Sequence, residues 1–324
     1  MAIALNSSTL VTIYGGSGFI GRYVVRALAK TGCRMRIAVR RPDLAGHLQP
    51  MGGVGQINPV QANLRDMDSV RLAAEGADAL VNLVGILYQH GRQKFMAVQA
   101  EGAGRVAQVA AEIGAGAFVH LSAIGADPTS KSLYARSKAA GEDAVMKAFP
   151  SANVIRPSIV FGPEDEFFNR FAAMARISPF LPLIGGGKTE FQPVFVGDVA
   201  KTVVAALDGQ ASPGTAYELG GPEVLSFKAL MEYILMETRR HRLLLPMPMW
   251  LAKLQAMAFS ILPHPPLTLD QLHLLERDNV VGEAAIAQQR TLAGLDIEPV
   301  AIETIVPTYL ERFRPKGQFS RSFA

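Results

Sequence analysis

The sequence predicts an α/β protein, built as a doubly wound parallel sheet of about seven strands with a smaller, mainly helical C-terminal lobe. The first reason is that short apolar segments alternate with amphipathic helical segments over the first half of the chain, as in parallel sheets covered by helices. The second is a glycine-rich turn at residues 15–21, between the first apolar segment and the first helical one. Such a turn between a strand and a helix is typical of Rossmann folds.

The bulk composition describes a packed globular protein. The chain has 324 residues, of which 49% are hydrophobic and 19% charged, so it exceeds one average domain and is not a disordered chain. Its single cysteine, Cys33, excludes an internal disulfide framework and fits a reducing compartment. Six histidines occur without any pair at metal-ligand spacing, and we therefore expect no metal site.

Basic residues gather in a few places, although the net charge is only +4. The clusters lie at residues 40–41, 239–242 and 312–321. No aromatic-rich basic motif accompanies them, so we expect no nucleic-acid partner. Such clusters are usually solvated, and the alternative is contact with an acidic protein surface or an anionic lipid.

The glycine-rich turn predicts a site for the pyrophosphate of a dinucleotide. Gly15 allows a tight turn, Gly18 allows the backbone to approach the phosphates, and Gly21 allows the helix to pack against its strand. The N–H groups at the start of the helix then face the anion. The predicted phosphate-binding segment also contains Ser17, Phe19 and Ile20. An ordinary glycine-rich turn is the alternative.

The elements of the sheet domain follow from the apolar pattern. The expected strands are Leu10–Tyr14, Met35–Val39, Gln56–Val60, Ala79–Val84, Ala117–Ser122, Asn153–Ile155 and Ala216–Leu219. The expected helices are Phe19–Lys30, Asp66–Gly76, Gln93–Ile113, Ser132–Ala148 and Val199–Leu207, the last with Asp198 as its N-cap. Pro59 cannot donate to a central ladder, which predicts that the third strand lies at an edge, as in the order 3-2-1-4-5-6.

The domain boundaries follow from where this alternation ends. Residues 1–160 are expected to form the dinucleotide-binding domain, and residues 190–222 to return to its sheet. After Pro157 proline and glycine become dense, which indicates that the chain leaves the sheet. Residues 161–189 and 223–324 are therefore assigned to the C-terminal lobe.

The end of the second strand predicts which cofactor the domain prefers. An NAD-preferring fold has an acidic residue there, which accepts hydrogen bonds from the adenosine ribose. This chain has Arg40 and Arg41 instead. Guanidinium groups suit a 2′-phosphate, so NADP(H) is the expected cofactor. A solvated surface pair is the alternative.

Other strand ends supply further candidate contacts, because ligands of such sheets lie outside the carboxyl ends of the strands. Asn63 and Leu64 are expected beside the adenine. Leu83, Val84 and Gly85 are expected beneath the ribose and pyrophosphate, with a plain core role equally open for the first two. Ser122 and Pro157, at the ends of the fifth and sixth strands, complete the candidate set.

Tyr134 and Lys138 stand one helical turn apart, on one face of the helix that follows the fifth strand. In a nucleotide-binding fold, such a lysine can hold the nicotinamide ribose and depress the pKa of the phenol. The phenol can then act as a general acid or base toward a carbonyl.

With these features the chain resembles the short-chain dehydrogenase/reductase superfamily. More narrowly, it is similar to the NAD(P)H-binding accessory subunits of respiratory complex I, over residues 11–313. The segments that carry this likeness are Tyr134–Glu142, Ala148–Pro150, Arg156–Ser158, Phe161–Gly162, Glu164–Asp165 and Gln192–Val194. The resemblance implies a bound NADPH, other complex I subunits as partners, and a structural role where the peripheral arm meets the membrane arm. It also implies a peripheral location on the inner membrane, on the cytoplasmic side in a bacterium or the matrix side in a mitochondrion.

The resemblance also indicates that the chain is a non-catalytic subunit. The active members of the superfamily add a serine after the fifth strand and an asparagine in the preceding helix. Ala123 and Gln99 stand at the matching positions, with Ser122 adjacent to the first. Tyr134 and Lys138 would then serve to bind the ribose. Two other functions stay open, an active NADP-dependent reductase or epimerase on an apolar substrate and an NADPH-sensing regulatory protein.

The segment Leu243–Leu262 is the second informative feature, with about twenty mostly apolar residues. Its prolines and its polar residues Lys253 and Gln255 argue against a spanning helix. The spacing of Trp250, Leu254 and neighbouring apolar residues predicts a broad apolar face beside the preceding arginines. We expect this segment to contact a membrane surface, anionic lipid or a hydrophobic partner, and a core helix of the lobe is the alternative.

Overall fold

The computed structural model describes residues 3–259 and 267–317. The chain divides into two compact units. The first unit contains residues 1–157, 196–219 and 282–298, and the second contains residues 158–195, 220–281 and 299–324. This division differs from the expected one at residues 282–298, which belong to the first unit and not to the C-terminal lobe. Arg290 explains this difference, because its guanidinium donates to the Ala216 carbonyl of the edge strand at 2.9 Å. The division also differs at residues 158–160, 190–195 and 220–222, which were expected in the sheet domain and belong to the second unit.

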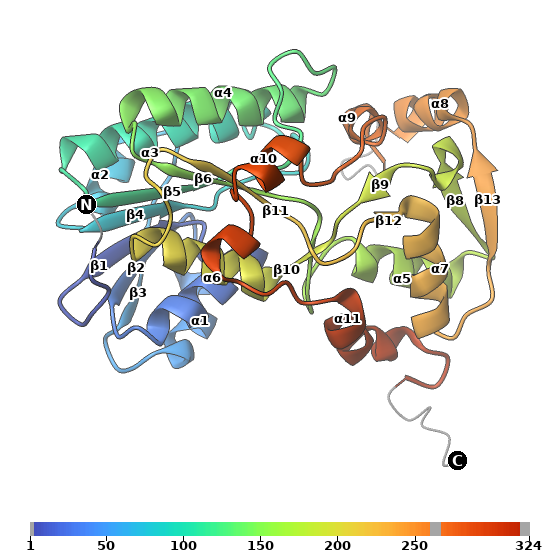
Figure 1. Cartoon of the computed structure of the whole chain (residues 1–324), viewed down its shortest axis with the longest axis horizontal. Coiled ribbons are helices and arrows are strands. Elements are labelled where there is room, and N and C mark those ends of the chain that lie inside the picture. The colour runs from blue at the N-terminus through green and yellow to red at the C-terminus, as the bar shows by residue number, and fades with distance from the viewer. Residues whose placement is uncertain (1–2, 260–266, 318–324) are drawn as a thin grey trace. The chain divides into compact units, whose positions relative to one another are not determined.

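The first unit is organised around a parallel seven-stranded sheet with the order β11-β6-β5-β4-β1-β2-β3 (Figure 1). Its strands are β1 (Leu10–Tyr14), β2 (Arg34–Val39), β3 (Ile57–Gln61), β4 (Ala79–Asn82), β5 (Ala117–Leu121), β6 (Asn153–Pro157) and β11 (Ala216–Leu219). The predicted fold class and strand order are confirmed. Pro59 lies on β3 opposite Ile37 of β2, at the edge, where its missing N–H leaves no central hydrogen bond unmade.

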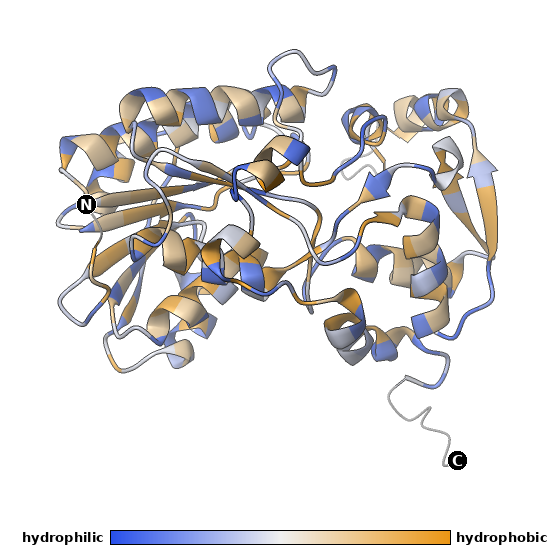
Figure 2. Cartoon of the chain, viewed as in Figure 1, coloured by the Kyte–Doolittle hydropathy of each residue, from blue (hydrophilic) through white to orange (hydrophobic). Residues whose placement is uncertain are grey.

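Helices cover both faces of this sheet. They are α1 (Phe19–Ala29), α2 (Met67–Ala74), α3 (Glu101–Glu112), α4 (Leu133–Ala148), α6 (Val196–Leu207) and α10 (Glu283–Ala287). Helices α2, α3 and α4 pack side by side over one face, and α1 packs beside α6 on the other (Figure 1). The strands between them are largely apolar in Figure 2, and side chains such as Val11, Ile37 and Leu80 are fully buried.

Two helix starts differ from the sequence-based expectation. The helix expected from Gln93 begins with a π-helical turn at Met96–Ala100, which leads into α3. Helix α6 begins at Val196, so Asp198 lies inside the first turn and is not the N-cap. The buried Asp198 carboxylate instead accepts a 2.9 Å hydrogen bond from Lys201 Nζ. The helix starts early because the two-residue strand before it runs directly into it.

The second unit is mainly helical and also contains three two-stranded pairs. Its helices are α5 (Phe168–Ile177), α7 (Phe227–Glu237), α8 (Met249–Phe259), α9 (Leu269–Leu274) and α11 (Ile302–Leu310). Its strands are β7 (Val160–Phe161), β8 (Phe180–Ile184), β9 (Glu190–Phe191), β10 (Val194–Phe195), β12 (Leu225–Ser226) and β13 (Leu243–Met247). Parallel pairs form between β7 and β10 and between β8 and β13, and an antiparallel pair between β9 and β12. The strand pairs were not foreseen.

Aromatic side chains form the core of this unit. Phe161, Phe168 and Phe227 are buried and stack edge-on or tilted against their neighbours. The Tyr309 hydroxyl, from α11, donates to the buried Asp165 carboxylate ahead of α5, so the C-terminal helix is joined to the start of the unit. Burial raises the pKa of Asp165.

The described part of the apolar segment Leu243–Leu262 forms a strand followed by a helix. Its first five residues form β13, and Met249–Phe259 form α8, while residues 260–262 lie outside the described residues. Pro248 precedes the helix, a place where the missing N–H is tolerated. Among residues 3–259 and 267–317, no helix is both long and apolar enough to span a bilayer.

Candidate functional site

The glycine-rich turn has a backbone that other residues would not tolerate. Gly15 has φ +81° and its N–H donates to the Ala38 carbonyl at 3.1 Å. A Cβ at this position would lie 3.0 Å from the Val84 side chain. At Gly21 a Cβ would lie 2.5 Å from the Gly15 carbonyl oxygen, so α1 can pack against the turn only through glycine.

The start of α1 offers unpaired N–H groups. Its N-cap is Gly18, which provides no side-chain hydrogen bond, and the first turn carries no acidic residue. The first helical residues are Phe19 and Ile20. Because no side chain caps this end, its N–H groups and the helix dipole suit an anion such as a pyrophosphate.

A pocket of about 250 Å³ lies against this turn, at the carboxyl ends of β1, β2, β3 and β4. Nine predicted residues line it, namely Gly15, Ser17, Gly18, Arg40, Asn63, Leu64, Leu83, Val84 and Gly85. The other lining residues were not predicted, and they are Tyr14, Ala38, Val39, Ala62, Arg65, Ile86, Gln93 and Val98. The predicted residues that do not line it are Phe19, Ile20, Gly21, Arg41, Ser122, Tyr134, Lys138 and Pro157.

The charge of the pocket is positive. Arg40 and Arg65 are its charged side chains, and no aspartate or glutamate occurs among its described lining residues. The Arg65 guanidinium donates to the Asn63 side chain at 3.4 Å and to the Arg92 carbonyl at 3.3 Å. Two guanidinium groups without a carboxylate favour an anionic ligand. Arg65 could have been found from the sequence, because it stands just beyond the end of β3, two residues after Asn63.

Arg41 does not line the pocket, although we expected it to contact the 2′-phosphate together with Arg40. Its guanidinium binds Asp43 through two hydrogen bonds, of 3.2 and 2.6 Å, on the exposed surface. This partner raises the pKa of Arg41 and lowers the pKa of Asp43. Asp43 is close enough because Pro42–Leu44 form a tight 3₁₀ turn directly after Arg41.

Lys138 is buried between the sheet and the pocket. Its Nζ donates to the Leu121 carbonyl at 3.0 Å, and a Cβ at the pocket residue Gly85 would lie 3.6 Å from it. Burial lowers the pKa of Lys138 to about 8, and Glu142 partly opposes this effect. The Tyr134 ring lies 5.9 Å from the same Nζ and stacks edge-on against Phe95. The structure therefore brings Tyr134 and Lys138 together, with the Lys138 ammonium close to the pocket residue Gly85.

Gln99, in the π-helical turn, connects helix α4 with the loop after β4 through two hydrogen bonds. Its Nε2 donates to Ser137 Oγ at 2.7 Å, and its Oε1 accepts from the Ile86 N–H at 3.0 Å. The amide is buried and holds α4 to the loop after β4. Turns of this π type often occur at functional sites, and here one places a side chain that braces the pocket wall.

The end of β5 supplies no accessible hydroxyl. Ala123 has none, and Ser122 Oγ is buried without a hydrogen-bond partner among the described residues. Pro157 ends β6 and is buried. Within residues 3–259 and 267–317, no three His, Cys, Asp or Glu side chains are grouped to hold a metal ion. The site is thus a cationic, glycine-floored pocket near the buried Lys138 and the half-buried Tyr134.

Comparison with known proteins finds relatives over most of the chain. Residues 11–220 match the NAD dependent epimerase/dehydratase family. The chain is 36% identical to the mitochondrial NADH dehydrogenase (ubiquinone) 1 alpha subcomplex subunit 9 of Arabidopsis thaliana, over 96% of this chain and 79% of that one. It is also 35% identical to the ceramide reductase of Caulobacter vibrioides, over 63% of this chain and 62% of the other.

The fold has relatives among solved structures as well. The NADPH-dependent quinone oxidoreductase QOR2 of Escherichia coli, solved as a complex with NADPH, superposes with a TM-score of 0.71 and 18% identity. The match covers 93% of this chain and 99% of that one. At this identity the likeness establishes the fold.

Proposed function

This chain belongs to the NAD dependent epimerase/dehydratase family, and we propose that it is a non-catalytic accessory subunit of NADH:ubiquinone oxidoreductase. In this role it holds NADPH as a structural ligand and stabilises the junction between the peripheral and membrane arms. The observation that carries the proposal is the 36% identity to a NADH dehydrogenase subunit over 96% of the chain, because it includes the second unit as well as the dinucleotide fold.

The pocket supports NADPH as the ligand. Gly15, Gly18 and the uncapped start of α1 suit the pyrophosphate. Arg40 and Arg65 suit the 2′-phosphate, which NADH lacks, and no lining carboxylate is positioned to accept from a ribose diol. A ligand at 100 times its Kd stabilises the folded state by about 2.7 kcal/mol, so a retained nucleotide would contribute appreciably to stability.

The surroundings of Tyr134 support the absence of turnover. When bound, a nicotinamide can donate or accept a hydride, but a carbonyl substrate must also be polarised and protonated. Ala123 lacks a hydroxyl for this, and the Ser122 hydroxyl is buried. Gln99 already uses both ends of its amide within the protein. Tyr134 and Lys138 are then left to hold the nicotinamide ribose.

The location proposed for the subunit is peripheral, on the inner membrane, with other subunits of the complex as partners. The test is to purify the respiratory complex natively and to measure whether this chain and NADPH are retained in equal amounts. Gly18→Asp should lower both, because a carboxylate would face the pyrophosphate. Tyr134→Phe should leave assembly and respiratory activity nearly intact. A chain that never travels with the complex would overturn the proposal.

One observation favours a second function, an active NADP-dependent reductase on an apolar substrate. The chain is also similar to a ceramide reductase over 63% of its length, and Lys138, whose pKa is lowered to about 8, lies beside Tyr134. Steady NADPH oxidation with a long-chain ketone, abolished by Tyr134→Phe, would establish this function. The same variant has no effect on assembly in the subunit proposal, so the two are separable.

A further inference from the structure

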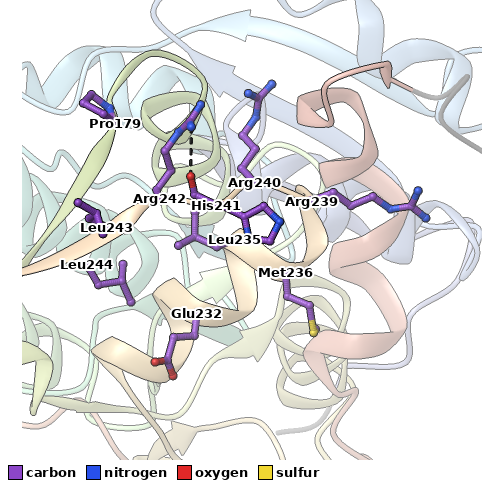
Figure 3. A pocket seen from close by; sticks show the side chains of 10 residues that line it. All are labelled: Pro179, Glu232, Leu235, Met236, Arg239, Arg240, His241, Arg242, Leu243 and Leu244. Atoms are coloured by element: carbon purple, nitrogen blue, oxygen red, sulfur yellow. Dashed lines mark hydrogen bonds between the residues drawn. The ribbon is translucent and has the colours of Figure 1, made fainter.

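The second unit has an open depression of about 750 Å³ where α7 ends and β13 begins (Figure 3). Four consecutive basic residues line it, Arg239 to Arg242, together with apolar side chains from α7 and β13 such as Leu235 and Leu243. Figure 3 shows Arg240 and Arg242 extending in one general direction and Arg239 in another. The depression lies outside the dinucleotide pocket and plays no part in holding NADPH.

The guanidinium groups of Arg240 and Arg242 are fixed in place without being neutralised. Arg240 Nε donates to the Phe313 carbonyl at 2.9 Å, and Arg242 Nε donates to the Ala175 carbonyl at 2.8 Å. Arg176 is a third member, because the Arg242 guanidinium binds the carbonyl of the adjacent residue Ala175. Burial and the charges of Arg242 and Arg176 lower the pKa of Arg240. Three like charges at close range repel one another, and an anion among them would remove this cost.

The nearby carboxylates are engaged elsewhere. The Glu237 carboxylate lies 3.4 Å from the Arg314 guanidinium. Glu232 is the acidic residue of the lining, and its carboxylate lies 3.6 Å from Lys228 Nζ. Among the described residues, neither Arg240 nor Arg242 forms an ion pair with a carboxylate. The planar forks of arginine match the oxygens of carboxylate and phosphate groups, so the cluster suits an anion of this kind, a phosphate headgroup included.

The backbone that presents these arginines is unfavourable for a residue with a Cβ. Arg239 has φ +51°, in the left-handed region where a helix normally ends on glycine. Arg240 N–H bonds back to the Leu235 carbonyl at 3.0 Å, so the turn directs residues 240–242 toward the depression. The conformation of this turn therefore does not explain why residue 239 is an arginine.

An exposed apolar surface continues from the arginines along β13 and α8. Phe180 and Leu243, which are register partners on β8 and β13, are both exposed. On α8 the small residues Ala252 and Ala256 are buried, whereas Trp250 is 65% and Leu254 51% exposed. A helix in contact with water alone buries its large side chains and exposes small or polar ones. This surface is therefore suited to an apolar surrounding.

We propose that Arg176, Arg240 and Arg242 form a phosphate site for an anionic phospholipid whose acyl region is covered by the exposed surface of β13 and α8. A cationic cluster that is joined through the exposed strand β13 to a tryptophan- and leucine-bearing helix has the character of a membrane-interface site. A soluble phosphate compound would use the arginines alone and leave the apolar surface uncovered. The inference deepens the proposed function, since it names the lipid class that the peripheral subunit contacts.

Vesicle binding of the purified full-length chain tests this inference. Trp250 is the single tryptophan, so its fluorescence reports directly on α8. The chain should bind vesicles of phosphatidylcholine with phosphatidylglycerol more tightly than phosphatidylcholine alone, and brominated lipid should quench Trp250. The double variant Arg240→Gln/Arg242→Gln should weaken the first binding about tenfold or more, because each basic residue near an anionic surface contributes about fivefold.

A matched pair on α5 keeps the test valid if the double variant fails to fold. Arg176→Gln should weaken binding to the anionic vesicles about fivefold, whereas Arg170→Gln on the same helix should have little effect. Equal losses for the two would mean a non-specific charge effect and would overturn the inference. Retention by the respiratory complex is measured separately, so failure of the proposed function remains distinguishable.

Two further outcomes would overturn the assignment of a lipid. If millimolar glycerol 3-phosphate removes the chain from anionic vesicles, the arginines form a site for a soluble phosphate compound. If the double arginine variant is retained less well by the lipid-depleted respiratory complex but binds vesicles normally, the cluster serves a protein contact.

Discussion

The two units use their helices in opposite ways. In the first unit, α1 buries Val24, Val25 and Leu28 against the sheet and presents an uncapped N-terminus beside the pocket. In the second unit, α8 buries only two alanines and exposes Trp250 and Leu254. The first arrangement builds a rigid floor for a small anionic ligand. The second leaves apolar area uncovered, which suits a unit that is completed by an external surface.

The arginines of the two units extend this contrast. Arg40 and Arg65 line a pocket at the carboxyl ends of the strands, where the backbone supplies further donors. Arg240 and Arg242 are held by backbone carbonyls beside exposed leucines. Substitutions in the first unit should therefore affect nucleotide binding and stability together, and substitutions in the second should affect docking.

The largest effect is expected at Gly21. Gly21→Val should destabilise the chain by about 3 kcal/mol or more, because its Cβ would lie 2.5 Å from the Gly15 carbonyl and α1 would have to move. Gly18→Ala is the control, since its Cβ would lie 3.4 Å from the same oxygen. Chemical denaturation measures both. Equal losses would show that the turn does not depend on close packing at Gly21.

The cofactor preference is expected to depend on Arg40. Arg40→Asp should weaken NADPH binding by roughly 2 kcal/mol or more and NADH binding far less, because a charged hydrogen bond to the 2′-phosphate is replaced by repulsion. Arg41→Asp should have a small effect, since Arg41 binds Asp43 outside the pocket. Titration calorimetry with both nucleotides decides the matter. Similar losses of NADPH and NADH would contradict a 2′-phosphate contact.

The buried Lys138 predicts a pH dependence of stability that is confined to the first unit. Its pKa is lowered from 10.5 to about 8, so above pH 8 the unfolded chain binds more protons than the folded one, up to about pH 10.5. The free energy of unfolding should therefore rise with pH in this window, by about 1.5 kcal/mol between pH 8 and 9.5. Lys138→Met should flatten this slope in denaturation curves of the nucleotide-free protein. A slope unchanged in the variant would assign it to other groups.

The smallest effect on stability is expected on the exposed side of α8. Leu254→Glu should change the free energy of unfolding by no more than about 0.5 kcal/mol, because Leu254 is half exposed. It should nevertheless release the chain from membranes at low salt and leave NADPH affinity near normal. Ala252→Glu is the contrasting variant, since a carboxylate at this fully buried position should be strongly destabilising. Misfolding of Leu254→Glu would remove the contrast between the units.

Much of the first unit could be predicted from the sequence because its signals are local. Apolar strands, the glycine turn and Pro59 at an edge each follow from the conformational needs of a few neighbouring residues. Nine of the predicted binding residues line one pocket for a related reason, since parallel strands bring their carboxyl ends to one edge. Arg65 also follows the carboxyl end of a strand, β3, but it was not among the predicted residues.

Tertiary structure alone decided the features that depend on a distant or competing partner. Arg41 is taken out of the pocket by Asp43, and residues 282–298 join the first unit through contacts such as that of Arg290 with the Ala216 carbonyl. The segment from Leu243 divides because its first residues pair with β8, some sixty residues earlier in the chain. Hydrophobic periodicity shows that a segment has an apolar side, but which side is buried depends on what packs against it. On α8 the buried side is formed by two alanines, and large side chains such as Trp250 and Leu254 are exposed.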